Sequence, residues 1–170
     1  VGAFEVPAGW FQSLNPLFIL MFAPLFAWLW VKLNAMNKQP DAPIKILFGM
    51  LLTSIGFIFL IVGVFEMQVN PSAKSSMMWL TLAFLFHTLG ELCISPVGLS
   101  YVSKLVPPSW IGIMFGVYYL FIGMGNKLAG TMGGRIEEIT QTYSLTTFFL
   151  IFTIIPIAAG ALMVALSPLM

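Results

Sequence analysis

Five long apolar segments make up most of this 170-residue chain. Each is at least as long as the roughly 20 residues that an α-helix needs to cross the hydrocarbon core of a bilayer. The apolar positions run on without alternating with polar ones, which favours transmembrane helices over the short alternating strands of a membrane β-barrel. We therefore predict an all-α membrane protein without strands. The predicted spans are Trp10–Val31, Ile44–Phe65, Met77–Leu105, Trp110–Met132 and Tyr143–Leu166.

Polar and proline-containing segments join these spans. The predicted connectors are Asn34–Pro43, Glu66–Ser76 with its Asn70–Pro71 turn, Val106–Ser109 and Gly133–Thr142. Serine is a favoured residue at the amino-terminal end of a helix, because its hydroxyl can accept a hydrogen bond from a free backbone N–H. We expect Ser109 and Ser144 to begin the last two spans.

The basic residues indicate how the chain is oriented. The first and third connectors, with the residues that flank them, carry Lys32, Lys38, Lys45 and Lys104. The second and fourth connectors carry Lys74 and Arg135 together with Glu66, Glu137 and Glu138. The positive-inside rule places the first set in the cytoplasm. With five spans, this prediction puts Val1 outside and Met170 inside.

The composition agrees with a multi-pass protein of the cell membrane in contact with lipid. Hydrophobic residues make up 59% of the chain, charged residues only 8%, and the mean hydropathy is +0.99, whereas about a quarter of the residues of a soluble domain are charged. The net charge is +1, and no run of basic residues suggests binding to nucleic acid or to anionic lipid. Cys93 has no second thiol to pair with, so we interpret it as a small packing residue.

Glu91 is the most informative residue, because it stands near the middle of the apolar third span. A carboxylate at the centre of a bilayer costs at least about 2.5 kcal/mol on insertion scales, so a functional role is its first interpretation. Burial at low dielectric constant disfavours the charged form of a carboxyl group, and a nearby ammonium favours it. Glu91 is therefore a candidate both for carrying a proton and for binding a cationic substrate group. The alternative is a structural carboxyl group satisfied by neighbouring side chains.

His87 and Ser95 lie four residues to either side of Glu91, a spacing that places all three on one face of a helix. Ser95 could contact a substrate or simply bond its own helix backbone. His87 could relay protons or bind a metal, although a structural histidine is the alternative that we favour. A His-x-x-x-Glu pair provides only two ligands, whereas a catalytic zinc needs about three from the protein. An intramembrane metalloenzyme would thus need a third ligand.

Polar residues in two other spans are further candidates. Gln12 and Asn15 lie near the start of the first span, directly before Pro16. An asparagine can both donate and accept hydrogen bonds, so Asn15 suits a substrate with ammonium or carboxylate groups, but it could equally be an interfacial helix cap. Tyr118, in the fourth span, needs a hydrogen-bonding partner or a wet cavity for its phenol group. Pro96 should bend the third span close to Glu91.

No nucleophile elbow, phosphate-binding loop, zinc signature or dinucleotide fingerprint occurs in the sequence. We therefore expect a protein that is not an enzyme and uses no cofactor beyond a coupling proton.

Three segments resemble the proton-dependent oligopeptide transporter family of the major facilitator superfamily. They are Phe11–Pro16 (FQSLNP), Gly90–Ser100 (GELCISPVGLS) and Phe115–Gly130, which ends in GNKLAG. The resemblance spans nearly the whole chain. It implies that residues 1–170 form one domain, a carboxy-terminal transmembrane bundle whose spans correspond to helices eight to twelve, with Val1–Gly9 as the preceding outer loop.

The resemblance also implies a function and site residues. Asn15 and Glu91 match residues that hold the amino terminus of a peptide, Ser95 matches a nearby polar contact, and Tyr118 stands where many members have a pocket tryptophan. Glu91 is the residue expected to couple protons. The family's first-helix Glu-x-x-Glu-Arg motif, its fourth-helix lysine and its seventh helix have no counterpart here. We therefore expect a fragment that works only with the missing amino-terminal bundle and seventh helix.

The function expected on these grounds is proton-coupled symport of di- and tripeptides by alternating access. One alternative is the same fold moving another solute, such as nitrate, a drug or an amino acid conjugate. Alternatives of another class are a non-transporting structural fragment and the metalloenzyme considered above.

Overall fold

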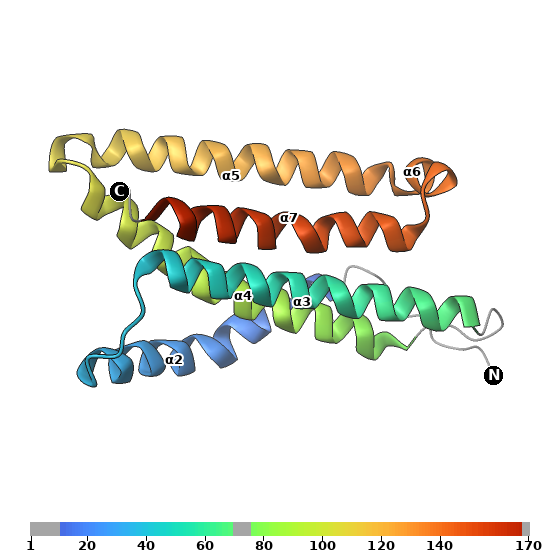
Figure 1. The fold of residues 1–170 in the computed structure, drawn as a ribbon, viewed down its shortest axis with the longest axis horizontal. Coiled ribbons are helices and arrows are strands. Elements are labelled where there is room, and N and C mark those ends of the chain that lie inside the picture. The colour runs from blue at the N-terminus through green and yellow to red at the C-terminus, as the bar shows by residue number, and fades with distance from the viewer. Residues whose placement is uncertain (1–10, 70–75, 168–170) are drawn as a thin grey trace.

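The computed structural model describes residues 11–69 and 76–167, and these residues form helices without any strand. Five long helices run antiparallel to their neighbours in sequence (Figure 1). They are α2 (Leu14–Ala35), α3 (Ala42–Val69), α4 (Met77–Leu105), α5 (Ile111–Gly134) and α7 (Leu145–Leu166). Each is long and apolar enough to cross a membrane. The prediction of an all-α, multi-pass membrane protein is confirmed.

The observed and predicted helix bounds agree best for the third span, which is α4. Helix α4 begins and ends at the predicted residues, because the Ser76 hydroxyl accepts a hydrogen bond from the N–H of Met78 and a proline pair follows Val106. Helix α2 continues to Ala35, beyond the predicted end at Val31. Trp10, the segment 1–9 and the Asn70–Pro71 turn lie outside the described residues.

Two predictions about the last connectors are wrong. The Gly133–Thr142 segment contains a short helix, α6 (Ile136–Thr142), whose first turn carries Glu137 and Glu138. Acidic side chains there interact favourably with the positive end of the helix dipole. Ser109 does not cap the fourth span, because it lies inside the 3-10 helix η1 (Pro108–Trp110), which starts with a proline. Ser144 does cap α7, accepting a hydrogen bond from the N–H of Thr147 at 3.2 Å.

Helix α3 is the centre of the bundle and packs against both α4 and α7, while α2 packs against α4 (Figure 1). Small residues allow this close approach. A Cβ atom built on Gly90 of α4 would lie 2.6 Å from the carbonyl oxygen of Gly49 on α3. On the other side of α3, a Cβ atom on Gly160 of α7 would lie 2.8 Å from the Leu47 side chain. Such small-residue contacts are the usual means by which membrane helices pack closely.

Polar contacts tie α3 and α4 at the end where they are joined. The indole N–H of Trp79 donates to the carboxylate of Glu66 at 2.7 Å, and the backbone N–H of Ser76 donates to the same oxygen at 3.1 Å. Cys93, also on α4, is buried at 3% exposure, in agreement with a packing role. The outcome is a firmly joined helix pair that carries Glu91.

Helix α5 differs from the others because it packs mainly at its ends. It contacts η1, α6 and α4, and none of its residues is buried. Its glycines have open space around them: an added Cβ atom at Gly112, Gly116 or Gly123 would meet nothing within 4 Å among the described residues beyond its own helix backbone and chain neighbours. In this chain, then, α5 presents most of its surface outwards.

Candidate functional site

Helices α2 and α4 meet at a hydrogen bond between two of the predicted site residues. Nδ2 of Asn15 donates to Oε2 of Glu91 at 3.2 Å. Asn15 lies in the first turn of α2, directly before Pro16, whereas Glu91 lies at the midpoint of α4. Proline is tolerated in the first turn of a helix because the N–H it lacks would have no intrahelical partner there. Because Asn15 contacts Glu91, it is level with the middle of the α4 span, which argues against its being an interfacial cap.

A third residue, Thr88, completes this contact and was missed in the sequence. Its hydroxyl lies 3.2 Å from Oδ1 of Asn15 and 2.8 Å from the carbonyl oxygen of Phe84, as donor to both. A hydroxyl has one proton, so the two acceptors share it. Thr88 is 1% exposed. Its position three residues before Glu91, on the same side of the helix, is the sequence signal that could have indicated it.

The carboxylate of Glu91 remains available to a ligand. The residue is exposed, and the Asn15 amide engages only Oε2. An ionised carboxylate has two oxygens that accept hydrogen bonds, and the Asn15 amide group has two N–H donors. The carboxylate can accept hydrogen bonds from a charged ammonium group, or Glu91 can instead hold a proton, while the second N–H of Asn15 can donate to an acceptor on the ligand. Within the ranges 11–69 and 76–167, no side chain forms an ion pair with Glu91.

His87 faces another part of the bundle, although its spacing from Glu91 predicted a shared face. Its ring lies against Gly56 of α3, where an added Cβ atom would fall 2.6 Å from Nε2. The ring centroids of His87 and Phe57 are 4.6 Å apart, and Phe57 in turn stacks on Phe152 of α7 at 5.6 Å. Nε2 is buried without a hydrogen-bonding partner in the described part of the chain. His87 thus lies in the packing between α4, α3 and α7, away from Asn15.

Ser95 and Tyr118 extend the face of α4 that begins at Glu91. Ser95 is exposed one turn further along, and Gly98 follows another turn later. Positions separated by four and seven residues lie on one side of a helix. Tyr118 of α5 is half-buried and reaches this side, since a Cβ atom on Gly98 would lie 2.8 Å from its hydroxyl oxygen. The structure therefore brings Asn15 and Glu91 into contact and places Ser95 and Tyr118 further along the same face of α4.

The described residues do not provide a metal site. No group of three His, Cys, Asp or Glu side chains in the described part of the chain is arranged to hold a metal ion. The third ligand that the metalloenzyme alternative needs is thus not provided by these residues.

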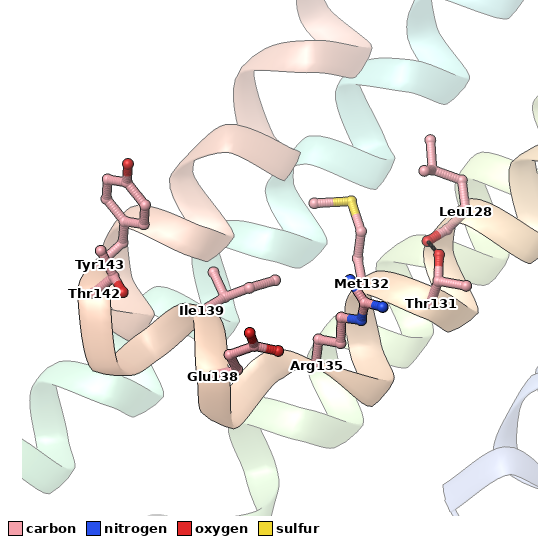
Figure 2. A pocket seen from close by; sticks show the side chains of 8 residues that line it. All are labelled: Leu128, Thr131, Met132, Arg135, Glu138, Ile139, Thr142 and Tyr143. Carbon is pink, nitrogen blue, oxygen red and sulfur yellow. Dashed lines mark hydrogen bonds between the residues drawn. The ribbon is translucent and has the colours of Figure 1, made fainter.

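A separate cavity of about 440 Å³ lies between the end of α5 and α6 (Figure 2). Its lining residues are Leu128, Thr131, Met132, Arg135, Glu138, Ile139, Thr142 and Tyr143. The hydroxyl of Thr131 donates to the Leu128 carbonyl oxygen of its own helix at 2.8 Å. None of the predicted site residues lines this cavity, so it is distinct from the Asn15–Glu91 site.

Comparisons with known proteins agree on one family. The family model described as the POT family matches residues 1–158. The chain is 39% identical to the uncharacterized transporter YclF of Bacillus subtilis, over 99% of this chain and 32% of that protein. It is 34% identical to the peptide transporter YePEPT of Yersinia enterocolitica, over 98% of this chain and 32% of that protein.

A solved structure gives the same result. A crystal structure of a mutant peptide transporter POT in complex with alafosfalin superimposes with a TM-score of 0.78 at 32% identity, over 99% of this chain and 33% of the other. The chain therefore spans about a third of the length of the relatives that it matches.

Proposed function

Because this chain belongs to the POT family of transporters, we propose that it forms the carboxy-terminal part of a proton-coupled symporter for di- and tripeptides. The rest of such a transporter would supply the other wall of the substrate site, as the two halves of major facilitator transporters do. Alternating access would then come from rocking of one bundle against the other around that site. The peptide class is supported by the relative YePEPT, which is a peptide transporter, and by the peptide transporter of similar structure.

The observation that carries this proposal is the hydrogen bond between Asn15 and Glu91 at the middle of α4. An exposed carboxylate at this depth, with an amide beside it, suits the ammonium group at a peptide's amino terminus. The ammonium would be drawn to the ionised carboxylate, and the Asn15 amide would hold the carboxylate in position. Polar atoms of the peptide backbone would extend from there along α4 towards Ser95 and Tyr118.

The length of this face fits a short peptide. Gly98 follows Glu91 by seven positions, and a helix rises about 1.5 Å per residue, so the two residues are roughly 10 Å apart along α4. An extended chain covers at most about 3.3–3.6 Å per residue, so three residues span a similar length. Tyr118, beside Gly98, would thus contact the far end of a tripeptide.

Glu91 would also link substrate binding to protons. A protonated carboxyl group has lost the charge that attracts an ammonium, and an arriving ammonium favours the ionised form. Binding of a peptide would therefore release the proton from Glu91 to another acceptor in the transporter. Glu91→Gln keeps the shape of the side chain and its hydrogen bond acceptor towards Asn15, but it can neither ionise nor carry a proton.

The test is uptake of a labelled dipeptide into proteoliposomes that contain the full-length transporter, with and without an inward proton gradient. We expect gradient-driven uptake in the unmodified protein and its loss in Glu91→Gln. Glu137→Gln is the matched control, because Glu137 is an exposed carboxylate on α6, outside the site. Normal driven uptake by Glu91→Gln would overturn the role of Glu91. An unmodified protein that moves no peptide would overturn the peptide assignment.

A further inference from the structure

A cavity of about 400 Å³ lies between α2, α3 and α4, at the end where α2 ends and α3 begins. Its charged lining residues are Lys45 of α3, Lys104 of α4 and Asp41 of the connector. The two lysines are far apart in the sequence, and no run of basic residues contains them. Folding therefore creates a basic cavity that the sequence pattern did not reveal.

Lys45 is unusual because it is a buried cation, with 9% of its surface exposed. Its ammonium group lies 4.8 Å from the ring centroid of Trp30, which stabilises a cation through the electrons of the ring face. Neither Lys45 nor Lys104 forms an ion pair with any residue in the described part of the chain. Buried charges are normally paired with an opposite charge, because leaving water is costly for an isolated ion.

The electrostatics around Lys45 are those of an anion site. The charged groups of the cavity lining are two lysines and one aspartate, so the net charge of the cavity wall is positive. Ser100 and Tyr101 add hydroxyl groups to the lining, while Trp30, Pro96 and Val97 provide an apolar wall. The cavity thus combines two cations and hydroxyl donors with an apolar surface that suits the hydrocarbon part of a bound ligand.

The predicted orientation places this end of the bundle at the cytoplasmic membrane surface. Phosphate groups of anionic lipids lie at that depth, and basic pockets between helices on this side bind such headgroups. We propose that the cavity binds a phosphate group through Lys45 and Lys104, and that the group is the phosphodiester of an anionic phospholipid. A free phosphate has the same chemistry, and the experiment separates the two sources. This site does not depend on peptide transport.

The test is native mass spectrometry of the full-length transporter released from nanodiscs that contain phosphatidylglycerol and phosphatidylcholine in equal amounts. A lysine near the membrane surface contributes about fivefold to the binding of anionic lipid, so removing two should cost roughly 25-fold. We expect Lys45→Gln/Lys104→Gln to lose the retained phosphatidylglycerol, and Lys45→Arg to keep it. Lys32→Gln is the matched control: Lys32 also lies over a tryptophan ring, 4.6 Å from Trp28, but does not line the cavity.

A second arm identifies the source of the phosphate. If inorganic phosphate raises the melting temperature of the unmodified protein in neutral detergent, and this effect is lost in the double variant, the site takes soluble phosphate. If phosphate has no effect but lipid retention depends on both lysines, the occupant is the lipid. Equal phosphatidylglycerol retention in the double variant and in Lys32→Gln, without a phosphate effect, would overturn the proposal. Should the double variant not fold, Lys104→Gln alone decides, because Lys104 is exposed and about a fivefold loss is still expected.

Discussion

The hydroxyl of Thr88 donates to Oδ1 of Asn15 at 3.2 Å, and this contact turns the amide so that Nδ2 faces Glu91. Thr88 is 1% exposed, and its hydroxyl determines which group of the Asn15 amide faces the carboxylate of Glu91. The candidate site is thus a chain of three side chains, in which Thr88 orients Asn15 and Asn15 holds Glu91.

Replacing Asn15 with Ala should weaken peptide affinity more than folding. A hydrogen bond to a charged group is worth about 1.5–3 kcal/mol, so we expect the half-saturation concentration for a dipeptide to rise about tenfold or more. The measurement is uptake against peptide concentration in proteoliposomes. Ser13→Ala is the control, because Ser13 is exposed and its side chain makes no capping bond. An unchanged half-saturation concentration in Asn15→Ala would contradict a substrate contact there.

Thr88→Val should have a smaller effect of the same kind. Valine keeps the shape of threonine but removes the hydroxyl, so Asn15 loses the contact that orients its amide. A net hydrogen bond is worth about 1 kcal/mol, and we expect roughly a fivefold rise in the half-saturation concentration. Thr88→Ser retains the hydroxyl and should transport like the unmodified protein. If valine and serine behave alike, Thr88 acts through packing alone.

Gly90→Ala should destabilise the fold. The added methyl group would lie 2.6 Å from the Gly49 carbonyl oxygen, and a backbone atom in a packed helix cannot easily move away. Overpacking of this kind costs about 1–3 kcal/mol, and we expect the melting temperature of the purified full-length protein to fall by several degrees. Gly112→Ala adds the same group where no other helix of the described residues lies within 4 Å, so it is the control. Equal melting temperatures would show that α3 and α4 can separate at low cost.

Gly98→Ala should change transport rather than stability. Here the added methyl group meets the hydroxyl oxygen of Tyr118 at 2.8 Å, which is the tip of a side chain that can turn aside. We expect a displaced Tyr118, a higher half-saturation concentration for tripeptides and an unchanged melting temperature. Tyr118→Phe in the same protein removes the clashing oxygen and should restore part of the tripeptide affinity. If the double variant recovers no tripeptide affinity, the effect of Gly98→Ala does not act through Tyr118.

His87→Ala should be milder in transport than either Glu91→Gln or Asn15→Ala. The ring packs against Gly56 and Phe57, so its removal leaves a cavity between α4 and α3. We expect a lower melting temperature together with proton-driven uptake close to normal per molecule of folded protein. Fluorescence-detected size-exclusion chromatography gives the amount of folded protein for this normalisation. A loss of driven uptake as complete as that in Glu91→Gln would assign His87 to the proton path.

The sequence allowed the helices to be predicted because the length of an apolar run determines whether it spans the membrane. Helix α4 was predicted with its observed bounds, since Ser76 and the Pro107–Pro108 pair mark its ends. Helix α6 was missed because seven residues are too few to show an apolar period, and its first turn carries two charged residues that favour a helix start.

The sequence also allowed part of the candidate site to be predicted. Asn15 and Glu91 could be chosen because a polar residue within an apolar span is costly. Helical spacing alone could not say which neighbouring helix each face of α4 meets, so His87 was grouped with Glu91 although it packs against α3. Thr88 was missed because a threonine hydroxyl commonly bonds its own helix, as it also does here with Phe84. The pairing of Lys45 with Lys104 depends entirely on how α3 and α4 pack.

The crossing of Gly49 and Gly90 also has a genetic consequence. Glycine lacks a Cβ atom, and every other residue has one, so any missense change at either position places an atom within 3 Å of the facing helix. The Cβ atom, which all these side chains share, then disturbs the packing of α3 and α4 more than the rest of the new side chain does. In a saturation mutagenesis library selected for membrane expression, every missense change at these two codons should be depleted relative to synonymous changes, whereas alanine and serine at Gly112 and Gly116 should not be depleted.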